Sequence, residues 1–208
     1  MERRDDDKLQ RGFERIVNFS DAVVAIAATL LVLPLVDIGV PEKGESVTEL
    51  LRDHSAELSA FVLTFAVICR LWVTHHSIFR DIVGYSGPLL FAYFVWLLAI
   101  VFLPFPTQLI AVGSSTFPGA DSVYLATIAL AAVAAFATHV VVARRPNLAV
   151  DGSQGFGSTL ESGVTFTLML AAFGLSFTPI GMWSLVALLL TTPVVRTINA
   201  VMGRHTAE

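Results

Sequence analysis

Four ionisable side chains interrupt the two apolar stretches nearest the amino terminus. Asp21 lies in the first stretch, and Arg70, His75 and His76 lie in the second. An ionisable group at the centre of a membrane helix costs about 2.5–3.5 kcal/mol on insertion scales, so each needs a partner or a function. A carboxylate beside an imidazole can share a hydrogen bond or pass a proton. These residues are therefore the first candidates for chemistry in this chain.

The two stretches have the length of membrane-spanning helices. They run from Ile16 to Val36 and from Leu58 to Phe79, and about twenty apolar residues rising 1.5 Å each cross a hydrocarbon core of about 30 Å. If the first helix enters the membrane near Arg15 and the second leaves it near Arg80, the carboxylate and both imidazoles lie within about 6–9 Å of the same boundary.

This depth brings Asp21 level with the histidine pair. We therefore expect Asp21 to accept a hydrogen bond from His75 or His76, with a further polar side chain completing a cluster between the helices: Ser20, Thr74 or Trp72. Two interpretations of the cluster are open. It either locks the packing of the two helices, or it takes part in gating or proton sensing, because histidine changes charge near neutral pH.

The composition argues against an ordinary soluble enzyme. Of the 208 residues, 55% are apolar and 14% are charged, whereas a soluble domain carries about 25% charged residues. Nucleic acid is not expected as a partner, because the basic residues form no cluster able to displace counterions. The single cysteine, Cys69, lies in an apolar stretch, where packing is its expected role.

Uncharged runs and turn signals predict an all-α membrane protein with six transmembrane helices and one repeat per chain. The run from Ile82 to Ala120 holds one helix and then a connection rich in Gly and Ser. The run from Ser162 to Val195 is interrupted by Pro179 and Gly181, which predicts two short helices in a hairpin. We expect a single six-helix domain over residues 1–208, with helices near 15–38, 57–80, 86–111, 122–143, 158–177 and 180–197.

The basic residues predict the orientation of these helices, because Lys and Arg accumulate on cytoplasmic loops. With six spans, only Lys43 and Arg52 fall on the outer side, and Arg70 lies within a span. The cytoplasmic segments hold Arg3, Arg4, Lys8, Arg11, Arg15, Arg80, Arg144, Arg145, Arg196 and Arg204. Both termini are therefore expected in the cytoplasm. The first apolar run is too long for a cleavable signal peptide, so we expect this helix in the mature protein.

The sequence contains no convincing motif for a metal site, an enzyme or a classical potassium filter. No HExxH or CxxC pattern occurs, and the adjacent histidines point in different directions on a helix, so neither a metal site nor a cofactor is expected. No GxSxG pattern occurs, which argues against an enzyme. Val83-Gly84-Tyr85-Ser86-Gly87 is similar to the TVGYG filter of potassium channels, but it directly follows Arg80-Asp81 without a re-entrant helix before it. We interpret this segment as a turn.

The start of the first helix carries a more specific motif. Arg15-Ile16-Val17-Asn18-Phe19-Ser20-Asp21, followed by the aliphatic run from Ala25 to Leu33, resembles the RxxxFSD signature of the transmembrane protein 175 family, the lysosomal potassium channels and their prokaryotic relatives. The segments 72–76 and 103–107 support the resemblance, and six spans match a single family repeat. The motif and its polar cluster comprise Arg15, Phe19, Ser20, Asp21, Trp72, His75 and His76.

This resemblance implies a potassium-permeable channel without a P-loop, in which the first helices of four subunits surround the pore. It implies a homotetramer, expected in the lipid bilayer of a prokaryotic plasma membrane. The hydrophobic constriction of the family falls on Ile26, Leu30 and Leu33, and Thr29 can offer a hydroxyl to the ion. The three aliphatic residues share one helix face at i, i+4 and i+7. Pro34 departs from the family pattern and predicts a kink after the constriction.

A ring of aliphatic side chains offers no oxygen atoms, so it can set a diameter and gate by dewetting, but it cannot replace the water around an ion as carbonyls do. Two other functions stay open. A proton-coupled or small-solute transporter would use Asp21, Arg70 and His75 as a polar relay, whereas a membrane scaffold would carry no current. An aliphatic stripe on a membrane helix also commonly faces lipid or a neighbouring helix.

Overall fold

The computed structural model describes residues 2–145, apart from 42–45, 80–81, 83, 85 and 114–115. The chain divides into two compact units, Met1–Asp151 and Gly152–Glu208, and every described residue belongs to the first. The helices predicted near 158–177 and 180–197 lie outside the described residues. The expectations of six spans and a single domain therefore stay predictions.

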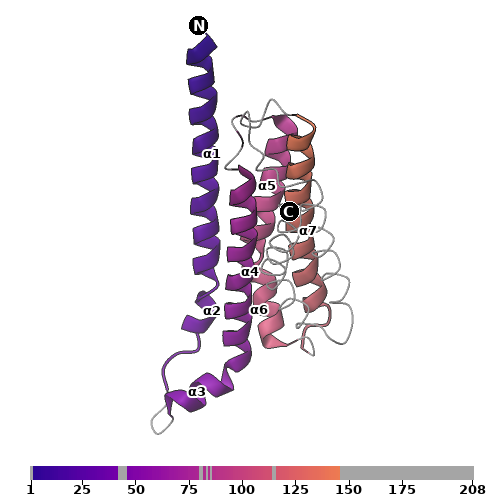
Figure 1. Ribbon diagram of the computed structural model, residues 1–208. Coiled ribbons are helices and arrows are strands. Elements are labelled where there is room, and N and C mark those ends of the chain that lie inside the picture. The colour runs from indigo at the N-terminus through magenta and orange to yellow at the C-terminus, as the bar shows by residue number, and fades with distance from the viewer. Residues whose placement is uncertain are drawn as a thin grey trace, which may run out of the picture. The chain divides into compact units, whose positions relative to one another are not determined.

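Seven helices make up the described part of the chain (Figure 1). They are α1 (Glu2–Leu30), α2 (Leu33–Val36), α3 (Val47–Asp53), α4 (Ser55–Phe79), α5 (Gly87–Phe102), α6 (Pro104–Val112) and α7 (Ala120–Ala143). Four segments are long and apolar enough to cross a membrane: Arg11–Val36, Ser55–His76, Gly87–Val112 and Ala120–Ala143. The predicted all-helical class is confirmed for this part of the chain.

The α1 helix differs at both ends from the helix expected near 15–38. It begins at Glu2 rather than near residue 15, because the charged residues before the apolar run are mostly good helix formers. It ends at Leu30, and the short helix α2 then carries Pro34 in its first turn. Proline has no backbone N–H, and its ring clashes with the carbonyl four residues earlier. The helix therefore breaks just before this proline.

A second proline break divides the third span, which was expected as one helix. The α5 helix ends at Phe102 and α6 begins at Pro104. The backbone N–H of Leu103 donates to the carbonyl oxygens of Ala99 and Ile100, at 3.2 and 3.3 Å. The break follows from Pro104 and Pro106, neither of which can donate a helical hydrogen bond.

The core of this unit lies between α4, α5, α6 and α7. The α5 and α7 helices share the most extensive contact, and α4 packs chiefly against α6. Three large aromatic side chains are almost fully buried: Tyr93, Trp96 and Tyr124. The buried hydroxyls of Thr64, Thr107 and Tyr124 are joined by hydrogen bonds of 3.1 Å and link α4, α6 and α7. The α1 helix contacts mainly α5 and α4, so the described elements leave its other side open.

Candidate functional site

One side of α1 is exposed along the membrane-spanning part of the helix. Ile26 and Leu33 are 59% and 52% exposed, and Leu30 is 39% exposed. The opposite side of the same segment is packed against the unit through Ser20, Val24, Ala27 and Leu31, all of which are buried. We call the exposed side the open face of α1, and its other members are Asn18, Phe19, Ala22 and Thr29.

The three residues of the predicted constriction thus lie on the open face, with Leu30 nearest its edge. Helical geometry accounts for this, because positions i, i+4 and i+7 share one side of a helix. Within the described residues, the open face lacks the protein neighbours that cover the other side. Whether it lines a pore is not shown by this geometry, so the constriction stays a prediction here.

Thr29 is the residue predicted to offer a hydroxyl to the ion beside the constriction. Its hydroxyl donates a hydrogen bond of 2.8 Å to the backbone carbonyl of Ile26 on the same helix. A hydroxyl has one proton and two acceptor lone pairs. Because the proton is engaged with the backbone, the oxygen of this exposed side chain can face outward as an acceptor, which suits contact with a cation.

A hydrogen bond connects the motif on α1 to α4. The carboxylate of Asp21 accepts this bond from the indole Nε1 of Trp72, with 2.8 Å between nitrogen and oxygen. The expected donor was a histidine, and this expectation is wrong for the described residues. Indole nitrogen is only a donor, so the direction of the bond is fixed.

The two histidines lie on different sides of α4. His76 is exposed and stacks on Trp72, with ring centroids 5.1 Å apart. His75 is buried and stacks on Trp96 and Phe79, with centroid separations of 3.7 and 4.3 Å. The Nε2 atom of His75 has no hydrogen-bond partner among the residues that the structure describes. His75 is therefore part of the aromatic packing between α4 and α5 rather than a partner of Asp21.

The remaining predicted residues are distributed along α1 and α4. The buried Ser20 hydroxyl donates to the carbonyl of Val17, at 2.8 Å, instead of joining the Asp21 bond. Arg70 donates from its guanidinium to the hydroxyl of Thr74, one turn along α4. Arg15 and Phe19 are both exposed.

Tyr93 is the residue that sequence reasoning missed. Its hydroxyl donates to the backbone carbonyl of Ile16 on α1, at 2.5 Å, and its ring lies 5.6 Å from that of His75. A sequence signal for this role exists, because a tyrosine within an uncharged membrane run needs a partner for its hydroxyl. Tyr93 and Trp72 together fix the amino-terminal half of the span to α5 and α4.

The described residues contain no cluster of three or more His, Cys, Asp or Glu side chains that could hold a metal ion. The arrangement thus combines an open, mainly apolar helix face with a polar and aromatic anchor behind it, in a protein whose helices can cross a membrane.

The class of protein follows from comparison with known chains. A family model described as "Endosomal/lysosomal potassium channel TMEM175" matches residues 15–104. The match begins at Arg15 of the motif and ends at the break between α5 and α6. The family is one of ion channels rather than of enzymes.

A solved structure extends the similarity to most of the chain. It is described as the crystal structure of a lysosomal potassium-selective channel TMEM175 homolog from Chamaesiphon minutus. It has 30% sequence identity to this chain and a TM-score of 0.65, and the match covers 91% of this chain and 98% of that one. The present chain belongs to the TMEM175 family.

Two curated relatives show the range of the family. A potassium channel of Chamaesiphon minutus is 40% identical over 107 residues, which are 47% of this chain and 48% of the relative. The endosomal/lysosomal proton channel TMEM175 of Gallus gallus is 38% identical over 73 residues, which are 32% of this chain and 15% of the relative. The alignment thus spans about half the length of the bacterial relative and much less of the avian one.

Proposed function

We propose that this protein is a potassium-permeable cation channel whose pore is lined by the open face of α1 from four subunits. The observation that carries the proposal is the contrast between the two sides of this helix. Ala27 and Leu31 are buried against the unit, whereas Ile26 and Leu33 are exposed. The potassium channels among the relatives support the assignment.

The polar members of the open face argue that it borders water rather than lipid alone. Asn18 and Thr29 are both exposed on the same side as the aliphatic residues. Polar side chains within a membrane segment generally face a bundle interior or a water-filled cavity. A passage formed between copies of α1 satisfies both kinds of side chain.

The passage of ions would be controlled by the width of the opening between the aliphatic side chains of the four subunits. Four Ile26 side chains offer no oxygen ligands, so the neck can close by losing its water and open by admitting it. Potassium holds its water less tightly than sodium, which gives a modest preference for potassium. The Thr29 oxygen, one turn beyond, then meets an ion that has lost part of its hydration.

The arrangement of the whole protein is part of the same proposal. We infer a homotetramer of six-helix chains in a prokaryotic plasma membrane, with both termini in the cytoplasm and potassium as the permeant species without any cofactor. The distribution of Lys and Arg between the predicted loops supports this orientation. In this orientation α3 lies on the outer side, and α2 lies in the outer part of the first span.

Recording from purified protein in planar bilayers, under opposed potassium and sodium gradients, tests the function. Unitary currents that reverse toward the potassium potential are expected. Ile26→Asn should raise the resting current, because a carboxamide keeps the neck wet. Val133→Asn, on the exposed side of α7, is the matched control and should leave the current unchanged. Currents insensitive to substitution of both Ile26 and Leu30 would remove the pore assignment.

The transporter alternative receives less support from the geometry. Its relay needs Asp21, Arg70 and His75 to act in sequence. Asp21 instead bonds to Trp72, Arg70 bonds to Thr74, and His75 stacks on aromatic rings. Slow flux without unitary steps would favour the transporter, and no flux would favour a scaffold.

A further inference from the structure

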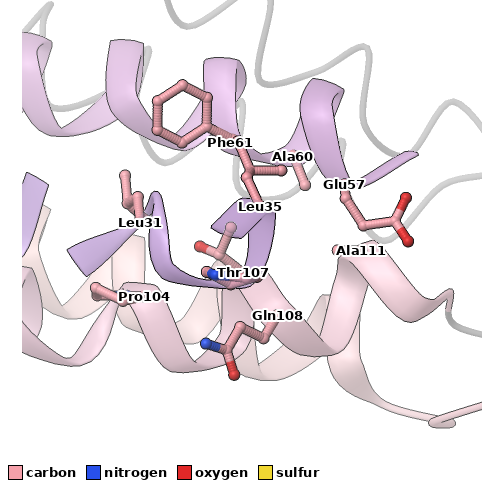
Figure 2. A pocket seen from close by; sticks show the side chains of 10 residues that line it. Leu31, Leu35, Glu57, Ala60, Phe61, Pro104, Thr107, Gln108 and Ala111 are labelled. Carbon is pink, nitrogen blue, oxygen red and sulfur yellow. The ribbon is translucent and has the colours of Figure 1, made fainter. Parts of the chain in front are cut away.

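The two ends of the open face have different surroundings. At its carboxyl-terminal end, the break between α1 and α2 borders a recess that is also lined by α4 and α6 and has room for about one water molecule (Figure 2). At its amino-terminal end, α1 continues without a break to Glu2 (Figure 1). A ligand larger than water does not fit the recess, whereas the amino-terminal end of the face is exposed.

Packing determines which side of α1 is exposed at this amino-terminal end. Phe13 is buried and stacks on Phe79 of α4, with ring centroids 5.7 Å apart. Arg11 and Arg15 are both exposed. At about 100° per residue, the two arginines lie within about 60° of Ile26 around the helix axis. They therefore continue the open face toward the amino terminus.

Charges are sorted by side along this part of the helix. The segment 2–15 holds five basic and five acidic residues. Four of the basic positions, 4, 8, 11 and 15, lie within about 60° of Ile26 around the axis, and only Arg3 lies elsewhere. The acidic positions 2, 5, 6, 7 and 14 each lie at least about 70° from the middle of this basic side. The segment is thus neutral as a whole, but its continuation of the open face is basic.

The proposed tetramer gathers these basic sides around one axis, and this step rests on the proposed function. Arg11 and Arg15 of the four chains then form two rings of guanidinium groups, about 6 Å apart along the helix. Asn18, exposed on the same face, forms a ring of carboxamides one turn further into the span. Eight like charges repel one another and also repel a potassium ion. An anion held by several guanidinium groups at once relieves this repulsion.

We propose that the four α1 helices bind a soluble polyphosphate, a chain of at least three phosphate groups, between the rings of Arg11 and Arg15. Guanidinium groups bind phosphate oxygens through paired, charge-assisted hydrogen bonds, and the Asn18 amide adds donors. A chain of phosphates reaches both rings, whereas a single phosphate reaches one. A lipid headgroup shares this chemistry, but helices that enclose the axis keep lipid outside. The bound polyphosphate lies on the path of the ions and obstructs it.

Isothermal titration with inorganic triphosphate measures binding to the full chain in phosphatidylcholine nanodiscs. One triphosphate per four chains is expected, bound more tightly than orthophosphate. Arg11→Gln combined with Arg15→Gln should weaken binding about a hundredfold, because each hydrogen bond to a charged group contributes a factor of about ten. Arg11→Gln alone should weaken it about tenfold, which keeps the test decisive if the double variant does not fold.

The matched control removes two other arginines from the same chain. Arg144 and Arg145 are exposed after α7, and replacing both with Gln changes the net charge equally but should leave triphosphate binding unchanged. Binding that is equal in this control and in the Arg11→Gln, Arg15→Gln variant would overturn the proposal. Orthophosphate bound as tightly as triphosphate would also overturn it, because the two rings would then not share one ligand.

Native mass spectrometry separates a soluble anion from a lipid headgroup. Protein released from nanodiscs that contain cardiolipin should retain the same amount of this lipid in the wild type and in the Arg11→Gln, Arg15→Gln variant. Loss of cardiolipin in the variant would place the two arginines against lipid and overturn the proposal.

Potassium current in planar bilayers tests the position of the polyphosphate on the axis. Triphosphate should block the wild-type current from one side of the bilayer only, and it should not block the Arg11→Gln, Arg15→Gln variant. A current that is unchanged by saturating triphosphate would overturn this position. A wild type that conducts no potassium would instead refute the proposed function, while the titration would still decide whether four chains share one triphosphate.

Discussion

The donor to Asp21 is Trp72 and not the predicted histidine. The reason is the direction in which each side chain points around the axis of α4. Trp72 and His76 are four residues apart and share one side of the helix, where their rings stack. His75, one position before His76, lies on another side of α4 and packs against Trp96 on α5. Depth in the membrane can be read from the sequence, but rotation is set by packing between helices. The polar cluster was therefore predictable as a set of residues and not as a set of bonds.

The bond between Trp72 and Asp21 should contribute measurably to stability. Trp72→Phe keeps an aromatic ring and removes the donor, so it should lower the free energy of unfolding by about 0.6–1.7 kcal/mol, the range for hydrogen bonds between membrane helices. Asp21→Asn should lower it less, because the carboxamide oxygen still accepts the bond. Thermal unfolding in detergent measures both.

The control for this comparison is Asp37→Asn, which alters an exposed carboxylate after α2. It should unfold like the wild type. A stability of Trp72→Phe equal to that of this control would show that the bond between α1 and α4 contributes nothing to the fold.

At the level of elements, the four described spans were predictable because each is an uncharged or nearly uncharged run of sufficient length. The residues at which these helices begin and end were less predictable. A count of apolar residues finds the part of α1 that crosses the membrane and misses the helical turns that continue to Glu2 in charged sequence. The break at Pro104 was also missed, because a proline can be accommodated within a membrane span. The kink expected at Pro34 occurs as the break between α1 and α2.

The short helix α3 is fixed by its first turn, and this gives a prediction on pH. The Ser46 hydroxyl accepts from the backbone N–H of Glu49 at 3.2 Å. The Ser46 backbone N–H and the Ser46 hydroxyl both donate to the Glu49 carboxylate, each at 2.8 Å. The two bonds to the carboxylate, first that from the Ser46 backbone and then that from its hydroxyl, lower the pKa of Glu49 below its ordinary value of 4.5. The stabilisation is therefore complete above pH 4.5 and is lost as pH falls through the lowered pKa.

Carboxyl NMR of Glu49 in detergent micelles measures this shift. Ser46→Ala removes the hydroxyl and should raise the pKa of Glu49 toward 4.5 and weaken the helix start by about 1 kcal/mol. Ser59→Ala, at an exposed serine on α4, is the control. An unchanged Glu49 titration in Ser46→Ala would mean that the Ser46 hydroxyl does not stabilise the carboxylate.

At the level of the whole molecule, the proposed pore requires the open face of α1 to meet the same face of other copies of the chain. A helix that leaves Asn18 and Thr29 exposed beside Ile26 fits poorly against lipid alone, and closed rotational symmetry is the usual arrangement of homo-oligomers. Four identical helices around an axis place the same side chain in a ring. In the proposed tetramer, a residue introduced once per chain is presented four times at the neck, which makes the arrangement testable with a soft metal ion.

Ile26→Cys in a Cys69→Ser background should create such a ring, and Cd²⁺ should block potassium flux because soft thiolate ligands bind it together. Block should be reversed by a chelator, and it should depend steeply on pH because the thiolate is the ligand. Val133→Cys, exposed on α7, places its thiols away from the axis and should leave flux insensitive to Cd²⁺. Equal block of both variants, or conducting Ile26→Cys channels that Cd²⁺ never blocks, would place Ile26 outside the pore and leave the open face to be covered by lipid or by another surface.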